Sequence, residues 1–401
     1  MENRMTAVSE HMYNQAVSCA LTVSEAVDFL KREAKMRTLR EKLEKFSHGQ
    51  ELRPILVQGL MRNHPDAKRD AVERRVRGWL NNPENRTLRQ SDAIELCFIL
   101  GLSVEEADAF AALISEEGLH WRDPDEIVYI YSLKQGMDYA EAKKLNDEMR
   151  EILSGVTESR TPAEDSFTPI IRAEVASIAT REGLIDYLTG AVSRLGRYHN
   201  NAYKLFMEMM DALEHPALYE TEESAGLFER EKLTIRDVLR EYLFEENVLY
   251  AKGLVRGSRK KEDSPSEEGK LVFTVIQEEV SRCWPDESTI SKMKSRKTDV
   301  TRKVLILLFL ATDSGPVDEE DEDTESALSK EERFERLYQS LNNMLLLCGF
   351  KPIDPRSPFD WLILYCICTG DMFDVDSRMR DIFKEMFGER PEKQEQKAGQ
   401  A

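Results

Sequence analysis

Apolar residues recur at the spacing of an α-helix along almost the whole chain of 401 residues, and the alternating pattern of strands is nearly absent. From Val23 to Phe46 the apolar positions are separated by charged ones, which predicts one long, amphipathic and basic helix. Pro, Gly, Ser, Asn and Asp residues mark the expected helix ends. The sequence therefore predicts an all-α protein.

Several helices have well-marked boundaries. Residues 52–63, 67–81, 139–153 and 201–213 each carry an apolar stripe between helix-ending residues. Ser103-Val104-Glu105-Glu106 has the S-x-x-E pattern of a capping box, so another helix should begin there. Gly101 and Gly136 follow apolar helical runs and should end them.

The chain resembles itself in four segments that occur in the same order. RDPDEIVYIYSLKQG (122–136) aligns without a gap on RSPFDWLILYCICTG (356–370). Upstream, LVQGLMRNHPD (56–66) parallels VIQEEVSRCWPD (275–286), SDAIELCFILG (91–101) parallels TRKVLILLFLA (301–311), and Gly118-Leu119 parallels Gly349-Phe350. These matches predict duplication of a helical unit of about 85 to 115 residues. The alternative is two unrelated helical bundles that use the same types of capping residue at their helix ends.

A chain of this length should form more than one packed unit. We expect N-terminal amphipathic helices over 1–50, a first helical repeat unit over 51–155 and a helical middle region with a linker over 156–268. A second repeat unit with an acidic insertion should cover 269–388, and 389–401 should be a disordered tail.

In the second copy, DESTISKMKSR (286–296) precedes VTRKVLI (300–306). This polar helix start, basic turn and apolar following helix resemble the recognition half of the lambda-repressor-like (Xre) helix-turn-helix family. The first copy has the same outline in AVERRVRGWL (71–80), an Asn-rich turn and AIELCFILGLS (93–103). The resemblance covers part of each unit and implies helix-turn-helix-like units that bind DNA.

In the first copy, Val72, Val76, Trp79 and Leu80 form one apolar side of the expected helix, so Arg74 and Arg77 should point away from the core. Arg is well suited to guanine edges and phosphates. The candidate DNA-binding residues of the first copy are Lys68, Arg69, Arg74, Arg75 and Arg77. Those of the second copy are Ser291, Lys292, Lys294, Arg296 and Lys297. The alternative for both clusters is an ordinary solvated surface.

Charge is unevenly distributed. The net charge is −19, but residues 31–90 hold 16 Lys and Arg against 8 Asp and Glu, a local balance of +8. Residues 313–332 contain ten acidic residues and one Lys. We expect this acidic insertion to be a disordered solvated loop. A sharper hypothesis is that it folds over a basic face and competes with phosphate.

No motif points to catalysis or to a bound metal or cofactor. The sequence lacks a Gly-rich phosphate loop, H-E-x-x-H and G-x-S-x-G. The six histidines are expected to be isolated, with His199 a structural residue, and the six cysteines to be reduced core residues. The longest apolar run, 304–311, is too short for a membrane helix. We therefore expect a non-enzymatic cytoplasmic protein without cofactor.

Together these patterns predict a DNA-associated regulatory protein. Double-stranded DNA would be bound by the helix-turn-helix-like units, and a protein partner by the middle and C-terminal helices. The rival hypothesis is a protein-interaction or scaffold module that does not bind DNA, such as part of a bacterial defence or mobile-element system.

Overall fold

The computed structural model describes residues 6–18, 20–82, 87–115, 118–154, 168–192, 194–196, 198–215, 232–243, 276–277, 279–280, 284–312, 328–369 and 372–387. Regular structure in these ranges is helical, with no strand. The prediction of an all-α fold is therefore confirmed. No helix within the described ranges is both long and apolar enough to span a lipid bilayer.

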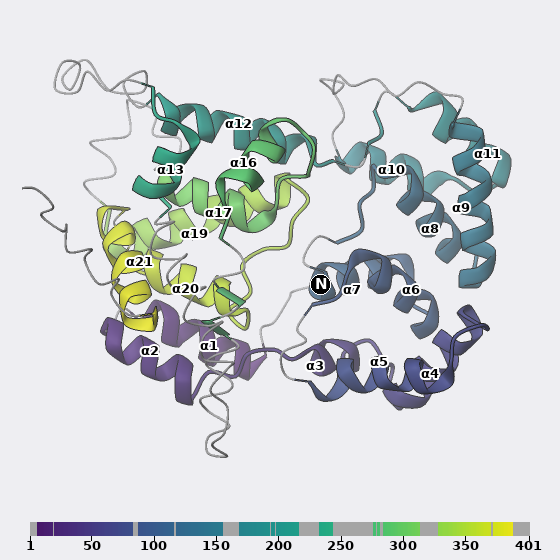
Figure 1. The fold of residues 1–401 in the computed structure, drawn as a ribbon, viewed down its shortest axis with the longest axis horizontal. Coiled ribbons are helices and arrows are strands. Elements are labelled where there is room, and N and C mark those ends of the chain that lie inside the picture. Colours follow the sequence, from purple (N-terminus) through teal and green to yellow (C-terminus); the bar gives the residue numbers. More distant parts are fainter. Residues whose placement is uncertain are drawn as a thin grey trace, which may run out of the picture.

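Buried side chains of the described residues form two hydrophobic cores, and the helices around each core make up a lobe (Figure 1). The central lobe consists of α3 (Leu39–Glu44), α4 (Leu52–Asn63), α5 (Arg69–Asn81), α6 (Gln90–Leu100), α7 (Val104–Ile114), α8 (Pro124–Lys134), α9 (Tyr139–Leu153), α10 (Thr168–Ser177) and α11 (Arg181–Gly190). The terminal lobe consists of α1 (Ala7–Val17), α2 (Val23–Arg32), α12 (Asn200–Glu214), α13 (Ile235–Glu241), α16 (Glu287–Lys294), α17 (Arg302–Ala311), α19 (Lys330–Leu347), α20 (Pro358–Ile367) and α21 (Met372–Phe387).

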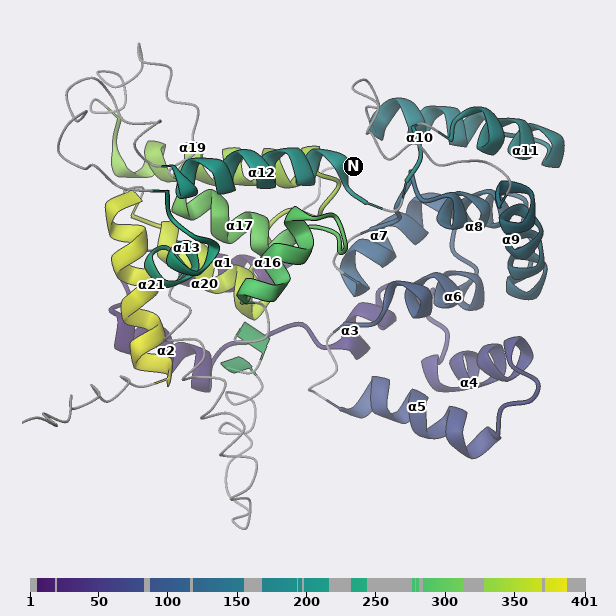
Figure 2. The same cartoon turned by 45° about the horizontal axis from the view of Figure 1, so that its top comes forward.

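The N-terminal helices pack against the C-terminal part of the chain. In the terminal lobe α1 lies against α20 and α2 against α21, and Figure 2 shows the purple and yellow ribbons together. Trp361 in α20 donates from its indole nitrogen to the carbonyl of Met12 in α1 at 2.9 Å. In the central lobe α10 and α11 lie against α8 and α9. The terminal core is therefore completed by α1 and α2 from the start of the chain, and the central core by α10 and α11 from its middle.

The division into cores differs from the five predicted segments. The expected helix over 23–46 is wrong, because the chain is not helical between α2 and α3 and passes there from one lobe to the other. Within 1–50, α1 and α2 belong to the terminal lobe and α3 to the central lobe. Within 156–268, α10 and α11 join the central core, and α12 and α13 the terminal core. Periodicity identifies an apolar face but not the helix that covers it.

Other boundaries follow the sequence closely. α4 and α9 span the predicted residues, and α7 begins with the expected capping box between Ser103 and Glu106. Gly101 ends α6 with a φ of 65°, in the left-handed region. α6 itself begins at Gln90 and has no side-chain cap. The acidic insertion up to residue 327 and the tail lie outside the described residues.

Two arginines hold the segments through which the chain passes between the lobes. Arg356 comes two residues before α20. Its Nε atom donates to the carbonyl of Lys35 at 2.9 Å, and its own carbonyl accepts from the N–H of Arg37 at 3.1 Å. The segment that leaves α2 is therefore fixed to the loop before α20.

Arg122 does the same at the second passage. It comes two residues before α8, donates from Nε to the carbonyl of Arg194 at 3.0 Å and accepts from the N–H of Gly196 at 3.0 Å. At both passages the bonded residues are two positions apart, and the arginine occupies the matching position of the aligned segments 122–136 and 356–370.

A buried acid in the first turn of α20 organises the loop before it. Asp360 is fully buried and forms two hydrogen bonds with the guanidinium of Arg302, at 2.8 and 2.9 Å. It also accepts from the N–H of Asp354, six residues earlier, at 2.8 Å. Arg302 continues to the carbonyls of Lys351 and Pro352. Each buried charge therefore has polar partners, as burial requires.

Glu126 repeats this arrangement in the first turn of α8. It accepts from the N–H of His120, again six residues earlier, at 2.7 Å. Gln90, the first residue of α6, takes the place of Arg302, the first residue of α17, and donates to Glu126 and to the carbonyl of Gly118.

A third contact also recurs at the same spacing. The N–H of Leu119 donates to Asp108 at 3.1 Å, and the N–H of Ile353 donates to Asn342 at 2.8 Å, each pair being 11 residues apart. These contacts align Leu119 of the first copy with Ile353 of the second, three positions after Phe350, the residue that the sequence comparison had matched with Leu119. The recurring contacts favour the duplication, which stays a prediction.

The cysteine side chains behave as predicted where they are described, and large aromatic side chains are buried beside them. Trp361 and Tyr365 are among the largest fully buried side chains. Cys97, Cys348, Cys366 and Cys368 are buried and form no disulfide among the described residues, whereas Cys19 and Cys283 lie outside those residues. Burial is the main cause that raises the pKa of the Cys366 thiol to about 12. The described cysteines therefore act as small apolar core residues.

We predict that Gly59→Ala destabilises the central lobe. A Cβ at Gly59 in α4 would lie 2.5 Å from Cγ2 of Ile99 in α6, so the two helices would have to separate. Overpacking of this kind costs about 1 to 3 kcal/mol, measured as the free energy of unfolding in urea. Gly190→Ala, which meets nothing within 4 Å, is the control and should not destabilise the protein. Equal effects would contradict the close packing of α4 on α6.

We also predict that Asp360→Ala costs about 3 to 5 kcal/mol of unfolding free energy, because it leaves the buried Arg302 guanidinium without a counter-charge. The matched control is Asp28→Ala, which removes an exposed pair with Arg32 at 4.0 Å and should cost less than about 1 kcal/mol. Urea denaturation followed by circular dichroism measures both. An Asp360→Ala cost as small as that of the control would contradict the role of the buried pair.

Candidate functional site

The first predicted basic cluster lies on α5, with the faces that the sequence predicts. Val72, Val76 and Trp79 are buried in the central core, whereas Arg74 and Arg77 are exposed. The apolar side of α5 packs on α3 and α4, which fixes the orientation of the helix. The predicted outward direction of the two arginines is therefore confirmed.

The other cations of this cluster differ in their contacts. Arg69 pairs with Glu73 at 2.9 Å. Arg75 pairs with Asp92 at 2.7 Å and lies over the ring of Trp79. Lys68, Arg74 and Arg77 form no ion pair with any residue that the structure describes. Three cations on and before α5 are therefore available to an external anion.

The second predicted cluster is divided between solvent and internal contacts. Ser291, Lys292 and Lys297 are exposed. Lys294 forms an ion pair with the buried Glu214 in α12. Arg296 donates to the side chain of Asn200 at 2.6 Å and lies over the ring of Tyr203. Lys294 and Arg296 therefore join α16 to α12, which is a structural role that the sequence did not predict.

The two clusters belong to different lobes. α5 is part of the central lobe and α16 of the terminal lobe, and Figures 1 and 2 both place them well apart. The structure therefore does not bring the ten predicted residues together into one site.

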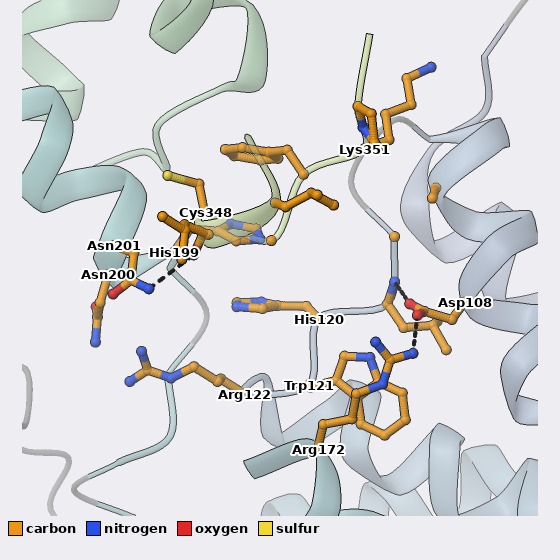
Figure 3. Close-up of a pocket in the computed structure, with 18 of the residues that line it drawn as sticks. Asp108, His120, Trp121, Arg122, Arg172, His199, Asn200, Asn201, Cys348 and Lys351 are labelled. Atoms are coloured by element: carbon orange, nitrogen blue, oxygen red, sulfur yellow. Dashed lines mark hydrogen bonds and ion pairs between the residues drawn. The ribbon is translucent and has the colours of Figure 1, made fainter. Parts of the chain in front are cut away.

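A cavity of about 770 Å³ lies between the lobes (Figure 3). The central lobe contributes the loop from Gly118 to Arg122 together with Asp108, Ala112 and Arg172. The terminal lobe contributes the start of α12, the end of α19 and the loop that follows α19. The volume lies in the range of small-molecule sites, about 300 to 1,000 Å³.

Two histidines from different lobes stack in this cavity, with ring centroids 4.4 Å apart and planes at 15°. Nδ1 of His199 lies 2.6 Å from Asp299, whose carboxylate also accepts from the His199 backbone N–H. The ring of Phe350 lies on His199 as well, with centroids 4.8 Å apart. The prediction that the histidines are isolated is therefore wrong for His120 and His199, because they meet only in the folded chain.

His120 is held neutral by its surroundings. Burial lowers its pKa well below the ordinary value, and the neighbouring His199 and Arg122 lower it further. Its Nε2 atom is buried and has no hydrogen-bond partner among the described residues, and the same holds for Nε1 of Trp121. Two unpaired polar nitrogens therefore lie in the cavity wall.

The charged groups of the cavity are mainly cationic. Arg172 pairs with Asp108 and lies over the ring of Trp121. Arg122 is 5% exposed, and among the described residues its guanidinium bonds only to the carbonyl of Arg194. Burial lowers the pKa of Arg122, and the nearby Arg296 adds to the effect. The cavity is therefore suited to an anion.

The cavity offers little for covalent chemistry. Cys348 is the one thiol among the described residues that line it, and burial raises the pKa of that thiol to about 12, so the thiolate is scarce near neutral pH. Among the described residues no group of three or more His, Cys, Asp or Glu side chains could share a metal ion. The geometry supports binding, through hydrogen bonds, charge and apolar contact.

No sequence pattern predicted this cavity. One available signal was the shared Arg of the aligned segments, since Arg122 and Arg356 occupy matching positions. The chain matches no protein-family model, no curated protein and no solved structure. Its function must therefore be inferred from its own residues.

We predict that His120→Gln weakens the pH dependence of stability. Because the pKa of His120 is lowered in the folded state, the unfolded chain binds the proton more readily, and stability falls as the pH drops below about 6.5. The variant should lose less stability between pH 7 and pH 5, by up to about 1.4 kcal/mol per pH unit. Urea denaturation at each pH measures this, with the exposed His11→Gln as control. Equal slopes in wild type and His120→Gln would contradict the lowered pKa.

Proposed function

We propose that the protein is a DNA-associated regulator that contacts duplex DNA through the exposed side of α5. The observation that carries this proposal is the pair Arg74 and Arg77, which are exposed and have no ion pair with the described residues. An unpaired guanidinium on a rigid helix can bind phosphate oxygens or the edge of guanine. Lys68 adds a third cation at the start of the same helix.

The charge distribution supports α5 as the contact. The whole chain is acidic, so only a locally basic region can approach the phosphate backbone without strong repulsion. Residues 31–90 form such a region, with a balance of +8. In this proposal α16 contributes Ser291, Lys292 and Lys297, whereas Lys294 and Arg296 keep their internal contacts.

The remaining parts of the proposal concern location and partner. Such a regulator acts in the cytoplasm, and a protein partner binds its middle and C-terminal helices. No resident cofactor is required, because phosphate and base contacts need only side chains of the protein.

The second candidate function is a protein-interaction or scaffold module that does not bind DNA. The internal contacts of Lys294 and Arg296 favour it, since these two cations belong to the segment that resembles a recognition helix. In that case the helix-turn-helix-like units serve as packing units.

We predict that Arg74→Gln/Arg77→Gln weakens binding to a generic DNA duplex of about 20 base pairs and makes it less sensitive to salt. Each lost phosphate contact should reduce the slope of log K against log salt by about 0.9, so the double variant should lose about 1.8. Fluorescence anisotropy at several salt concentrations measures both quantities.

The matched control is Lys204→Gln/Lys330→Gln, which changes the net charge equally at exposed positions of the terminal lobe, outside residues 31–90. It should leave the slope unchanged. Absence of binding by the wild type at low salt, or equal slopes for the two double variants, would overturn the DNA-binding proposal and favour the scaffold module.

A further inference from the structure

Arg122 and Arg356 hold the two passages between the lobes in the same way, but their guanidinium groups differ in one contact. Nη2 of Arg356 forms an ion pair with Glu41 in α3 at 2.8 Å. Nε and Nη2 of Arg122 both donate to the carbonyl of Arg194, and no carboxylate of the described residues pairs with this arginine. Of these two matching arginines, Arg356 therefore has a counter-charge, and Arg122 has none among the described residues.

The missing counter-charge matters because Arg122 is 5% exposed. A buried cation without an anion is costly, and proteins normally pair it or shift its pKa. Arg296, which lies nearby, bonds to Asn200 and also has no carboxylate partner among the described residues. Arg122 lines the cavity, and the positive charge of the nearby Arg296 adds to the charge that an external anion would balance.

Another part of the cavity wall is apolar. Leu346 and Leu347 at the end of α19 line the cavity and are 57% and 66% exposed. Phe350 continues this wall. Exposed large apolar side chains that line a cavity are typical of a ligand site. His120 and Trp121, whose buried ring nitrogens have no partner among the described residues, also line the cavity.

We propose that the cavity between the lobes binds a small organic anion. A carboxylate or phosphate group of the ligand accepts hydrogen bonds from Arg122, and its apolar body lies against Leu346 and Leu347. Because the walls come from both lobes, the bound ligand fixes the lobes relative to each other. The proposal is independent of DNA binding by α5.

The experiment uses two fluorescent probes that share one apolar body. Anilinonaphthalene sulfonate carries an anionic group, and N-phenyl-1-naphthylamine is its uncharged counterpart. The full chain should bind the anionic probe at one saturable site and more tightly than the uncharged probe. Arg122→Gln should weaken binding of the anionic probe roughly tenfold, which is the effect of losing one charge-assisted hydrogen bond, and should leave the uncharged probe nearly unaffected.

A second variant tests the apolar wall without touching the buried arginine. Leu347→Asn should weaken binding of both probes, whereas Ile152→Asn, at a 41% exposed position of α9 outside the cavity, should change neither. Thermal unfolding of each variant checks that it folds. If Arg122→Gln does not fold, Leu347→Asn with its control decides the question.

Several results would overturn the inference. These are the absence of saturable binding, an anionic-probe affinity unchanged in folded Arg122→Gln, and equal effects of Leu347→Asn and Ile152→Asn. Arg74→Gln/Arg77→Gln should bind the probes as the wild type does. DNA binding and ligand binding can therefore fail separately.

Discussion

The arrangement of the two lobes depends on hydrogen bonds from two arginines to the chain where it passes between the lobes. Each arginine precedes a helix that begins with Pro and donates to a carbonyl of the passing segment. Behind each arginine a buried acid fixes the preceding loop through a backbone N–H six residues earlier. The cavity between the lobes is lined by these two loops, so its geometry follows from the same contacts.

In both lobes a buried acid fixes the loop before the helix that begins with Pro, but the side chains that bond to this acid differ. Asp360 pairs with the cation of Arg302, whereas Glu126 bonds to the neutral Gln90. The arginine in the loop before α20 has a carboxylate partner in Glu41, and Arg122 has none among the described residues. A buried charge must be balanced by some group, and at Arg122 the balance is left to a ligand in our proposal.

The two functional proposals involve separate surfaces. α5 presents its cations on the outside of the central lobe, whereas the cavity lies between the lobes. α5 lies in the central lobe, and part of the cavity wall belongs to the same lobe. A ligand that fixes the lobes would therefore also fix the position of α5 relative to the terminal lobe.

The sequence by itself determined the helical fold, most helix boundaries and the outward direction of Arg74 and Arg77. These features depend on periodicity and capping, which involve neighbours a few residues apart. Only the tertiary structure decided that α1 and α2 complete the C-terminal core, that Lys294 pairs with Glu214, and that His120 stacks on His199. These contacts join residues 79 or more positions apart, and a local pattern shows that a side chain needs a partner without showing which one.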